Sequence, residues 1–188
     1  MGTLTLVTGG ARSGKSSFAE QQISSLCTKV AYIATAQVFD QEMEDRVQRH
    51  RLQRPLTWTT YEEPWSPASV FPRLGDECEA VLVDCLTILI SNLILREQSI
   101  DWDAPEQSAL NTLEEVVALA MEELFIACCT FTGSVFMVTN EVGQGIVPDT
   151  PLGRFFRDCS GRVNQRAASL SDTVYLVVAG IPVKIKGD

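Results

Sequence analysis

Eight residues near the start of the chain, Gly9-Gly10-Ala11-Arg12-Ser13-Gly14-Lys15-Ser16, match the phosphate-binding pattern G-x-x-x-x-G-K-[ST]. In this pattern the glycines let backbone N–H groups turn inward around phosphates, and the lysine places a positive charge at the β- and γ-phosphates. The serine hydroxyl is a ligand for Mg²⁺. A β-rich run precedes the motif and a helical pattern follows it, and this context favours nucleotide binding over a chance glycine-rich turn.

Short apolar runs alternate along the chain with segments of helical periodicity. Such alternation predicts an α/β fold, here a P-loop NTPase-like, mostly parallel sheet with helices on both faces. The expected strands are Leu4–Thr8, Val30–Ala34, Ala80–Asp84, Ser134–Thr139 and Thr173–Val178. The expected helices are Ser16–Leu26, Asp40–Arg51, Cys85–Leu95, Pro105–Cys129 and Leu152–Ser169.

Two segments depart from this alternation. The chain end, Tyr175–Lys186, reads as two strands around a turn at Gly180, which predicts a C-terminal β-hairpin on an exposed edge. The Pro-rich segment Pro55–Asp76, with a possible short strand at Thr57–Tyr61, is interpreted as an excursion over the sheet edge and not as a second domain. Residues 1–188 are therefore expected to form a single P-loop nucleotide-binding catalytic domain.

Composition narrows the classes of partner. A net charge of −9 argues against a general nucleic-acid binder, since neutralising phosphates requires a surplus of Lys and Arg. No apolar run approaches the roughly 20 residues that span a bilayer, and the start of the chain lacks the basic flank of a signal peptide. The six cysteines have no CxxC spacing and are interpreted as reduced thiols. We expect a cytoplasmic protein.

Asp84 stands at the end of the third expected strand. An acid at the carboxyl end of a buried parallel strand is where a P-loop protein holds Mg²⁺ or its water shell. The alternative is that Asp84 is the N-cap of the following helix. Asp84 is followed by Cys85, Leu86 and Thr87, so the D-x-x-G element of signalling GTPases is missing, as is N-K-x-D. These observations favour a small-molecule kinase over a regulatory switch.

His50 is the only histidine in the chain and lies among four arginines, which are Arg46, Arg49, Arg51 and Arg54. One reading is a solvated helix end, or a histidine that completes a helix C-terminus. The other is a nucleophile, because a neutral imidazole keeps a free nitrogen that attacks phosphorus, and flanking arginines stabilise charge on phosphoryl oxygens. Further arginines, at 154, 157, 162 and 166, are candidates for phosphate contacts or for solvated helix positions.

From about Thr3 to Lys186 the chain resembles the bifunctional adenosylcobinamide kinase/adenosylcobinamide-phosphate guanylyltransferase family of cobalamin biosynthesis. The resemblance rests on Val7–Ser16, Tyr32–Ala36, Arg46–Arg51, Thr139–Pro148, Phe156–Asp158, Gly161–Gln165 and Val183–Lys186. The form T-G-G-A-R-S-G-K-S together with Asn140-Glu141-Val142-Gly143 is far more specific than a phosphate loop alone.

The resemblance implies two reactions. Adenosylcobinamide is phosphorylated with GTP or ATP, and GMP from GTP is then transferred to the new phosphate through a GMP–histidine intermediate, giving adenosyl-GDP-cobinamide and pyrophosphate. His50 and Lys15 are the implied catalytic residues, Ser16 and Asp84 the implied Mg²⁺ ligands, and the assembly is implied to be a homotrimer. The implied nucleotide contacts are Gly9, Gly10, Ala11, Arg12, Ser13, Gly14, Lys15, Ser16, Ala34, Thr35, Ala36, Arg51, Leu52, Gln53, Arg54, Glu62 and Asp84.

Several alternatives remain open at this level. Glu62 is either an acceptor for guanine N–H groups or a solvated loop acid. A kinase with one activity, in which His50 is structural, and a non-catalytic nucleotide-binding protein are the two rival functions.

Overall fold

The structure, a computed structural model, describes residues 2–37 and 55–187. Within them the strands are β1 (Thr3–Gly9), β2 (Val30–Ala34), β3 (Thr59–Glu62), β4 (Ala80–Asp84), β5 (Ser134–Val138), β6 (Thr173–Val178) and β7 (Ile181–Lys186). The helices are α1 (Lys15–Leu26), α3 (Leu86–Arg96), α4 (Gln107–Thr130) and α5 (Pro151–Leu170), with a 3₁₀ helix, η1, at Pro67–Arg73. The expected helix at Asp40–Arg51 lies outside the described residues.

The seven described strands form one sheet in the order β3-β2-β4-β5-β1-β6-β7. All neighbours are parallel except β6 and β7, which form the predicted antiparallel hairpin at the chain end. Strand β5 lies between β1 and β4, and Val138 is the register partner of both Val7 and Asp84. The start of the phosphate loop and Asp84 therefore lie at the same level, at the carboxyl edge of the sheet.

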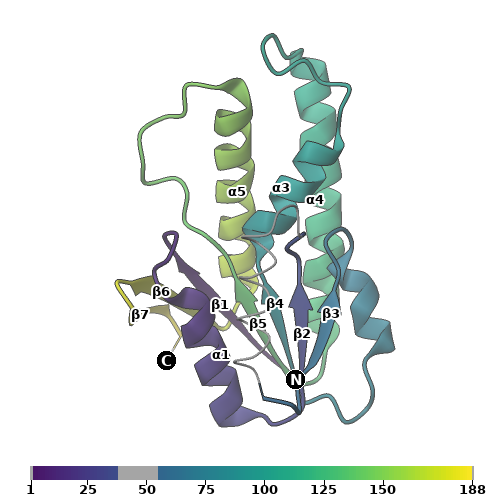
Figure 1. The fold of residues 1–188 in the computed structure, drawn as a ribbon, viewed down its shortest axis with the longest axis vertical. Coiled ribbons are helices and arrows are strands. Elements are labelled where there is room, and N and C mark those ends of the chain that lie inside the picture. The colour runs from purple at the N-terminus through teal and green to yellow at the C-terminus, as the bar shows by residue number, and fades with distance from the viewer. Residues whose placement is uncertain (1, 38–54, 188) are drawn as a thin grey trace.

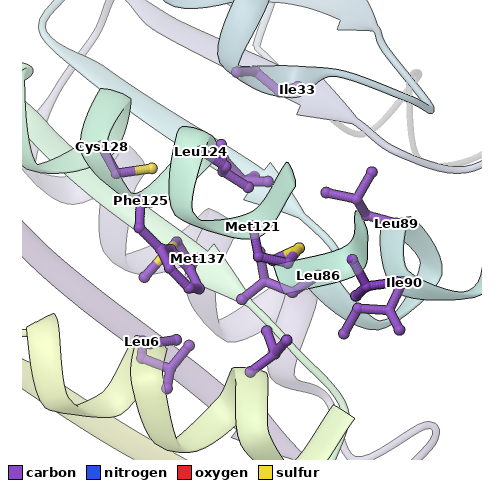
Figure 2. Close-up of a cluster of buried hydrophobic side chains, with 14 of the residues drawn as sticks. Leu6, Ile33, Leu86, Leu89, Ile90, Met121, Leu124, Phe125, Cys128 and Met137 are labelled. Carbon is purple, nitrogen blue, oxygen red and sulfur yellow. The ribbon is translucent and has the colours of Figure 1, made fainter. Parts of the chain in front are cut away.

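Helices cover both faces of the sheet, as predicted from the alternating pattern (Figure 1). On one face α1 packs through Ala19 and Ile23 against a smaller cluster that includes Val7, Leu82 and Val138. The larger cluster lies on the other face, under α3, α4 and α5. Figure 2 shows Met121, Leu124 and Phe125 of α4 gathered with strand residues such as Leu6 and Met137. Burial on both faces explains why the central strands read as continuous apolar runs.

The segment Pro55–Asp76, interpreted as an excursion over the sheet edge with a possible short strand at Thr57–Tyr61, contributes a strand to the sheet. Thr59–Glu62 forms β3, which pairs in parallel with β2 and is itself the edge strand of the sheet. The Pro-rich stretch after it forms η1, which packs against α4. The possible short strand at Thr57–Tyr61 is thus confirmed, with bounds shifted by one or two residues. The expectation that the segment lies over the sheet edge is wrong, because β3 is itself that edge, with the 9% exposed Trp58 stacked on Tyr32 of β2.

The cysteines are free thiols. Cys85, Cys128 and Cys159 are buried, Cys27 and Cys78 are partly buried, and Cys129 is exposed. Among the described residues, no helix combines the length and apolar character needed to cross a bilayer.

Candidate active site

The phosphate loop joins the end of β1 to the start of α1 and is held by backbone hydrogen bonds. Ser13 N donates to Gly10 O at 3.2 Å, and Glu141 N donates to Gly9 O at 3.0 Å. From the hairpin, Gly180 N donates to Ser13 O at 2.8 Å. The loop is thus fixed from both neighbouring strands of the sheet before any ligand binds, which reduces the ordering cost of binding.

The loop has a polar interior. The Thr8 and Ser13 hydroxyls are buried and have no hydrogen-bond partner, although buried polar groups nearly always have one. Lys15 is only 8% exposed, and its Nζ donates to Gly10 O at 3.2 Å. The buried ammonium of Lys15 and the two hydroxyl donors without acceptors together form a site suited to an anion such as a polyphosphate.

The backbone of the loop needs glycine at two positions. A Cβ on Gly9 would lie 2.4 Å from Val177 O, so the close approach of β1 to β6 excludes any side chain there. Gly14 has φ +94°, in a region that side-chain-bearing residues rarely adopt. This turn at Gly14 directs the start of α1, with its unpaired N–H groups and positive dipole end, at the loop.

Replacing Gly14 with alanine is therefore expected to destabilise the protein by about 1–2 kcal/mol through backbone strain. The same variant is expected to weaken binding of a nucleoside triphosphate, because the loop must distort. Gly161→Ala is the matched control, since a Cβ at Gly161 in α5 meets nothing within 4 Å. Thermal unfolding and nucleotide titration of both variants check this. Equal stability and equal affinity in Gly14→Ala would contradict it.

Asp84 lies at the end of β4, where its Oδ2 accepts a hydrogen bond from the Tyr32 hydroxyl at 2.9 Å. The alternative reading of Asp84 as a helix N-cap is wrong, because the N-cap residue of α3 is Cys85. The side chain is partly buried and stands level with the phosphate loop across β5. A carboxylate and the Ser16 hydroxyl are hard oxygen donors, and Mg²⁺ typically takes one or two such protein ligands and completes its shell with waters and substrate phosphates. This donor set fits Mg²⁺.

Thr35 follows β2 and is fully buried. Its hydroxyl accepts from Cys85 N and donates to Cys85 O, both at 2.8 Å, and its own N donates to Asp84 O at 3.1 Å. Asn92 Nδ2 donates to Thr35 O at 2.8 Å. All of these polar groups bond to protein. Through these contacts Thr35 stabilises the turn after Asp84. Its neighbours Ala34 and Ala36 are partly exposed.

Thr35→Val keeps the volume of the side chain but leaves the N–H and C=O of Cys85 without partners. We expect a loss of about 1–3 kcal/mol in the free energy of unfolding, or roughly 3–10 °C in Tm. Thr59→Val, at an exposed position on β3, is the matched control and is expected to stay within about 2 °C. Differential scanning calorimetry of both variants decides, and an unshifted Tm in Thr35→Val would show that the network does not hold the turn.

Cys85 lies between Asp84 and the start of α3, and the protonation state of its thiol argues against a role as a nucleophile. Burial raises the pKa of its thiol to about 11, the neighbouring charge of Asp84 adds to this effect, and Lys15 opposes it. The thiol therefore remains protonated at neutral pH, where a thiolate would be needed for attack. Its Sγ contacts Thr87 Oγ1 at 3.3 Å.

The end of β5 carries a polar network that sequence reasoning did not assign. Asn140 donates from its N and its Nδ2 to Thr87 Oγ1, at 3.1 and 2.8 Å. Thr139 Oγ1 donates to Asn164 Oδ1 at 2.7 Å, and Asn164 Nδ2 donates to Asn140 O at 2.9 Å. These bonds tie β5 to α3 and α5. The only sequence signal was the pair of motifs that contain Asn140 and Asn164, and Thr87 gave none.

The arginines of α5 have protein partners. Arg162 pairs with Glu114 at 2.6 Å and Arg166 with Glu122 at 2.6 Å, both across to α4. Arg157 pairs with Asp158, and Arg154 donates to the carbonyls of Pro148 and Asp149. These contacts support the interpretation of the four arginines as residues of the helix surface, two of which join α5 to α4.

The remaining candidates divide into two groups. Glu62 is exposed at the end of β3, and its register partner is Ala34, so it lies on the same carboxyl edge as Asp84. His50, Arg51, Leu52, Gln53 and Arg54 lie outside the described residues. The structure thus brings the phosphate loop, residues 34–36, Glu62 and Asp84 to one edge of the sheet, where open α/β sheets bind ligands.

A glycine-rich loop between the first strand of a parallel sheet and a helix defines P-loop nucleotide-binding proteins, and this chain is one of that class. The family model described as cobinamide kinase / cobinamide phosphate guanyltransferase matches residues 5–185. The chain therefore belongs to this family of enzymes, which have two activities and act in adenosylcobalamin biosynthesis.

Relatives agree with this assignment. The bifunctional adenosylcobalamin biosynthesis protein CobU of Escherichia coli is 42% identical over 183 residues, covering 97% of this chain and 99% of the relative. CobU of Salmonella typhimurium is 43% identical over 185 residues, with the same coverage of both chains. The bifunctional adenosylcobalamin biosynthesis protein CobP of Pseudomonas aeruginosa is 36% identical over 183 residues, covering 97% of each.

Proposed function

We propose that the chain first phosphorylates the aminopropanol hydroxyl of adenosylcobinamide, with GTP or ATP as donor. It then transfers GMP from GTP to the adenosylcobinamide phosphate, giving adenosyl-GDP-cobinamide and pyrophosphate. The observation that carries this proposal is the family match over residues 5–185, a range that contains the phosphate loop, His50 and Asp84. The phosphate loop, which is held by backbone hydrogen bonds and has a buried lysine, supports it, because both reactions need a bound triphosphate.

In the kinase reaction the acceptor oxygen bonds to the γ-phosphorus as the bond to the β-phosphate oxygen breaks. Lys15 at the loop stabilises negative charge on the phosphoryl oxygens, and the N–H groups at the start of α1 do the same. When bound, Mg²⁺ would be held by Ser16 and Asp84 and would neutralise charge on the triphosphate. Because phosphoryl transfer depends mainly on positioning and charge, a catalytic base is dispensable.

In the transfer reaction His50 is the proposed nucleophile. An imidazole nitrogen bonds to the α-phosphorus of GTP, the bond from that phosphorus to the bridging oxygen breaks, and pyrophosphate leaves. An oxygen of the cobinamide phosphate then attacks the same phosphorus, the P–N bond breaks, and the imidazole is restored. The arginines around His50 are proposed to attract the anionic acceptor.

The rest of the nucleotide site is proposed along the same edge. Residues 34–36, Arg51–Arg54 and Glu62 contact the nucleotide in this proposal. Glu62 is exposed, as an acceptor for guanine N–H groups must be. We also propose that the chain is a single catalytic domain and acts in the cytoplasm. We propose further that it assembles as a homotrimer, and light scattering in solution tests this by measuring the mass of the assembly.

The test is the first half of the transfer reaction, which needs no acceptor. Protein mixed with GTP and Mg²⁺ should gain the mass of one GMP moiety, with release of pyrophosphate. The linkage should be labile in acid and stable in alkali, as a phosphoramidate is. Peptide mapping should place it at His50. A protein that turns over cobinamide phosphate without ever gaining this mass would exclude the covalent route and leave only direct transfer.

A further inference from the structure

The loop between β5 and α5, residues 139–150, leaves the same sheet edge and stands away from the body of the protein (Figure 1). Both of its ends are fastened. At the start, Glu141 N bonds to Gly9 O of the phosphate loop, and Asn140 is held on Thr87. At the end, Arg154 Nη1 donates to Pro148 O and Asp149 O, at 3.0 and 2.7 Å. The span between them is therefore presented at a defined place beside the phosphate loop.

The middle of this loop is apolar and uncharged. Ile146 is 96% exposed and Val147 is 57% exposed, and we refer to these two residues as the apolar tip. The sequence around it, Val142-Gly-Gln-Gly-Ile-Val147, carries no charge in an otherwise acidic protein. Loop tips are usually built from Gly, Asn, Asp, Ser and Pro, so adjacent branched aliphatic residues there require an explanation. The apolar tip contributes nothing to the described core clusters.

We propose that the apolar tip, Ile146 and Val147, contacts the macrocycle of the corrinoid acceptor and thereby sets the affinity of the enzyme for it. This inference rests on the proposed function. The reacting oxygen of the acceptor is at the end of a side arm, so the arm reaches the phosphate loop while the large ring remains at the rim of the site. The loop, fastened to Gly9 at one end, stands at that rim.

The chemistry of the two surfaces agrees. A corrin ring has a broad, methyl-rich periphery with neutral amide arms, and a neutral aliphatic surface is suited to contact it. Glycines at 143 and 145 flank the polar Gln144, and a Cβ at Gly145 would meet nothing within 4 Å, so the backbone before the apolar tip has space around it. Contact with a ring would remove from water two side chains that the fold leaves exposed.

The double variant Ile146→Ser/Val147→Ser tests the inference. We expect the Kd for cobinamide phosphate, measured by equilibrium dialysis through the visible absorption of the corrinoid, to rise about tenfold. The KM for cobinamide phosphate should rise by a similar factor. The rate of GMP attachment to the enzyme, which needs only GTP, should stay within about twofold, since the inference places these side chains against the ring of the acceptor and not against the triphosphate.

Two controls accompany it. Leu119→Ser removes an aliphatic side chain that is 67% exposed on α4, away from the site, and should leave acceptor affinity unchanged. The conservative variant Ile146→Leu should retain wild-type affinity. An unchanged Kd in the double variant would overturn the inference, and so would an equal loss of GMP attachment or a change in the mass of the assembly, which would assign the loop to the nucleotide or to a neighbouring subunit.

The dialysis result is independent of the covalent step. If the wild-type enzyme never gains GMP, the proposed histidine chemistry fails, and the change in corrinoid Kd still decides whether the apolar tip meets the acceptor.

Discussion

His50→Ala is expected to lose all covalent labelling by GTP that carries radioactive phosphorus at the α-position. Since no other histidine exists in the chain, no second imidazole can take over the bond. Conversion of cobinamide phosphate should fall by on the order of a thousandfold or more, because loss of a nucleophile removes the covalent route altogether. The measurement is labelled protein after gel separation, together with the rate of pyrophosphate release.

The kinase reaction of the same variant is the internal control. Phosphorylation of cobinamide with ATP transfers the γ-phosphate to an alcohol and does not use an imidazole in our proposal, so its rate should remain within a few-fold of the wild type. A His50→Ala protein that still forms GDP-cobinamide at the original rate would sink the covalent mechanism. A protein that loses both reactions together would assign His50 to binding or structure instead.

Lys15→Met is expected to impair both reactions. The ammonium belongs to a buried side chain of the loop and donates to Gly10 O. Methionine keeps an unbranched side chain of similar length but removes the charge that would stabilise phosphoryl oxygens. We expect kcat/KM for each reaction to fall by about 10²–10³-fold, the usual cost of deleting one such stabilising group. Steady-state rates of both reactions, with either triphosphate, measure this.

Lys29→Met provides the matched control. Lys29 is an exposed lysine just before β2, at the amino end of the strands and hence at the opposite edge of the sheet. The same chemical change there should alter neither reaction. If Lys15→Met retained full activity in one reaction, the shared phosphate loop would be wrong, and the two reactions would require separate triphosphate sites.

Much of the fold could be predicted because parallel sheets impose a strong pattern on sequence. A strand covered on both faces, such as Val81–Val83, must be apolar throughout, and the intervening helices show a different period. The hairpin was also predictable, because Gly180 marks the turn between its two strands. Strand β3 was predicted only as a possible short strand at Thr57–Tyr61, because edge strands are short and mixed in character, and its pairing with β2 is seen only in the structure.

The candidate site was predictable only in part. Phosphate binding requires glycines for the backbone turn and a lysine for charge, so the phosphate loop could be recognised from the sequence. The alternative of Asp84 as an N-cap could be rejected only from the structure, which gives that position to Cys85. Thr35 was proposed as a nucleotide contact, and the structure places its hydroxyl on the backbone of Cys85. Pairings of this kind join residues fifty positions apart and leave no local pattern.

The sequence by itself determined the class of the protein: a loop that wraps phosphates needs particular glycines, a lysine and a following helix, all within eight consecutive residues. Only the tertiary structure decided which distant residues share that edge. It placed β5 between β1 and β4, so that Val7 and Asp84 flank Val138 and the loop after β5 rises beside the phosphate loop. The physical reason is that strand order depends on how helices pack across the sheet, an interaction between segments far apart in the chain.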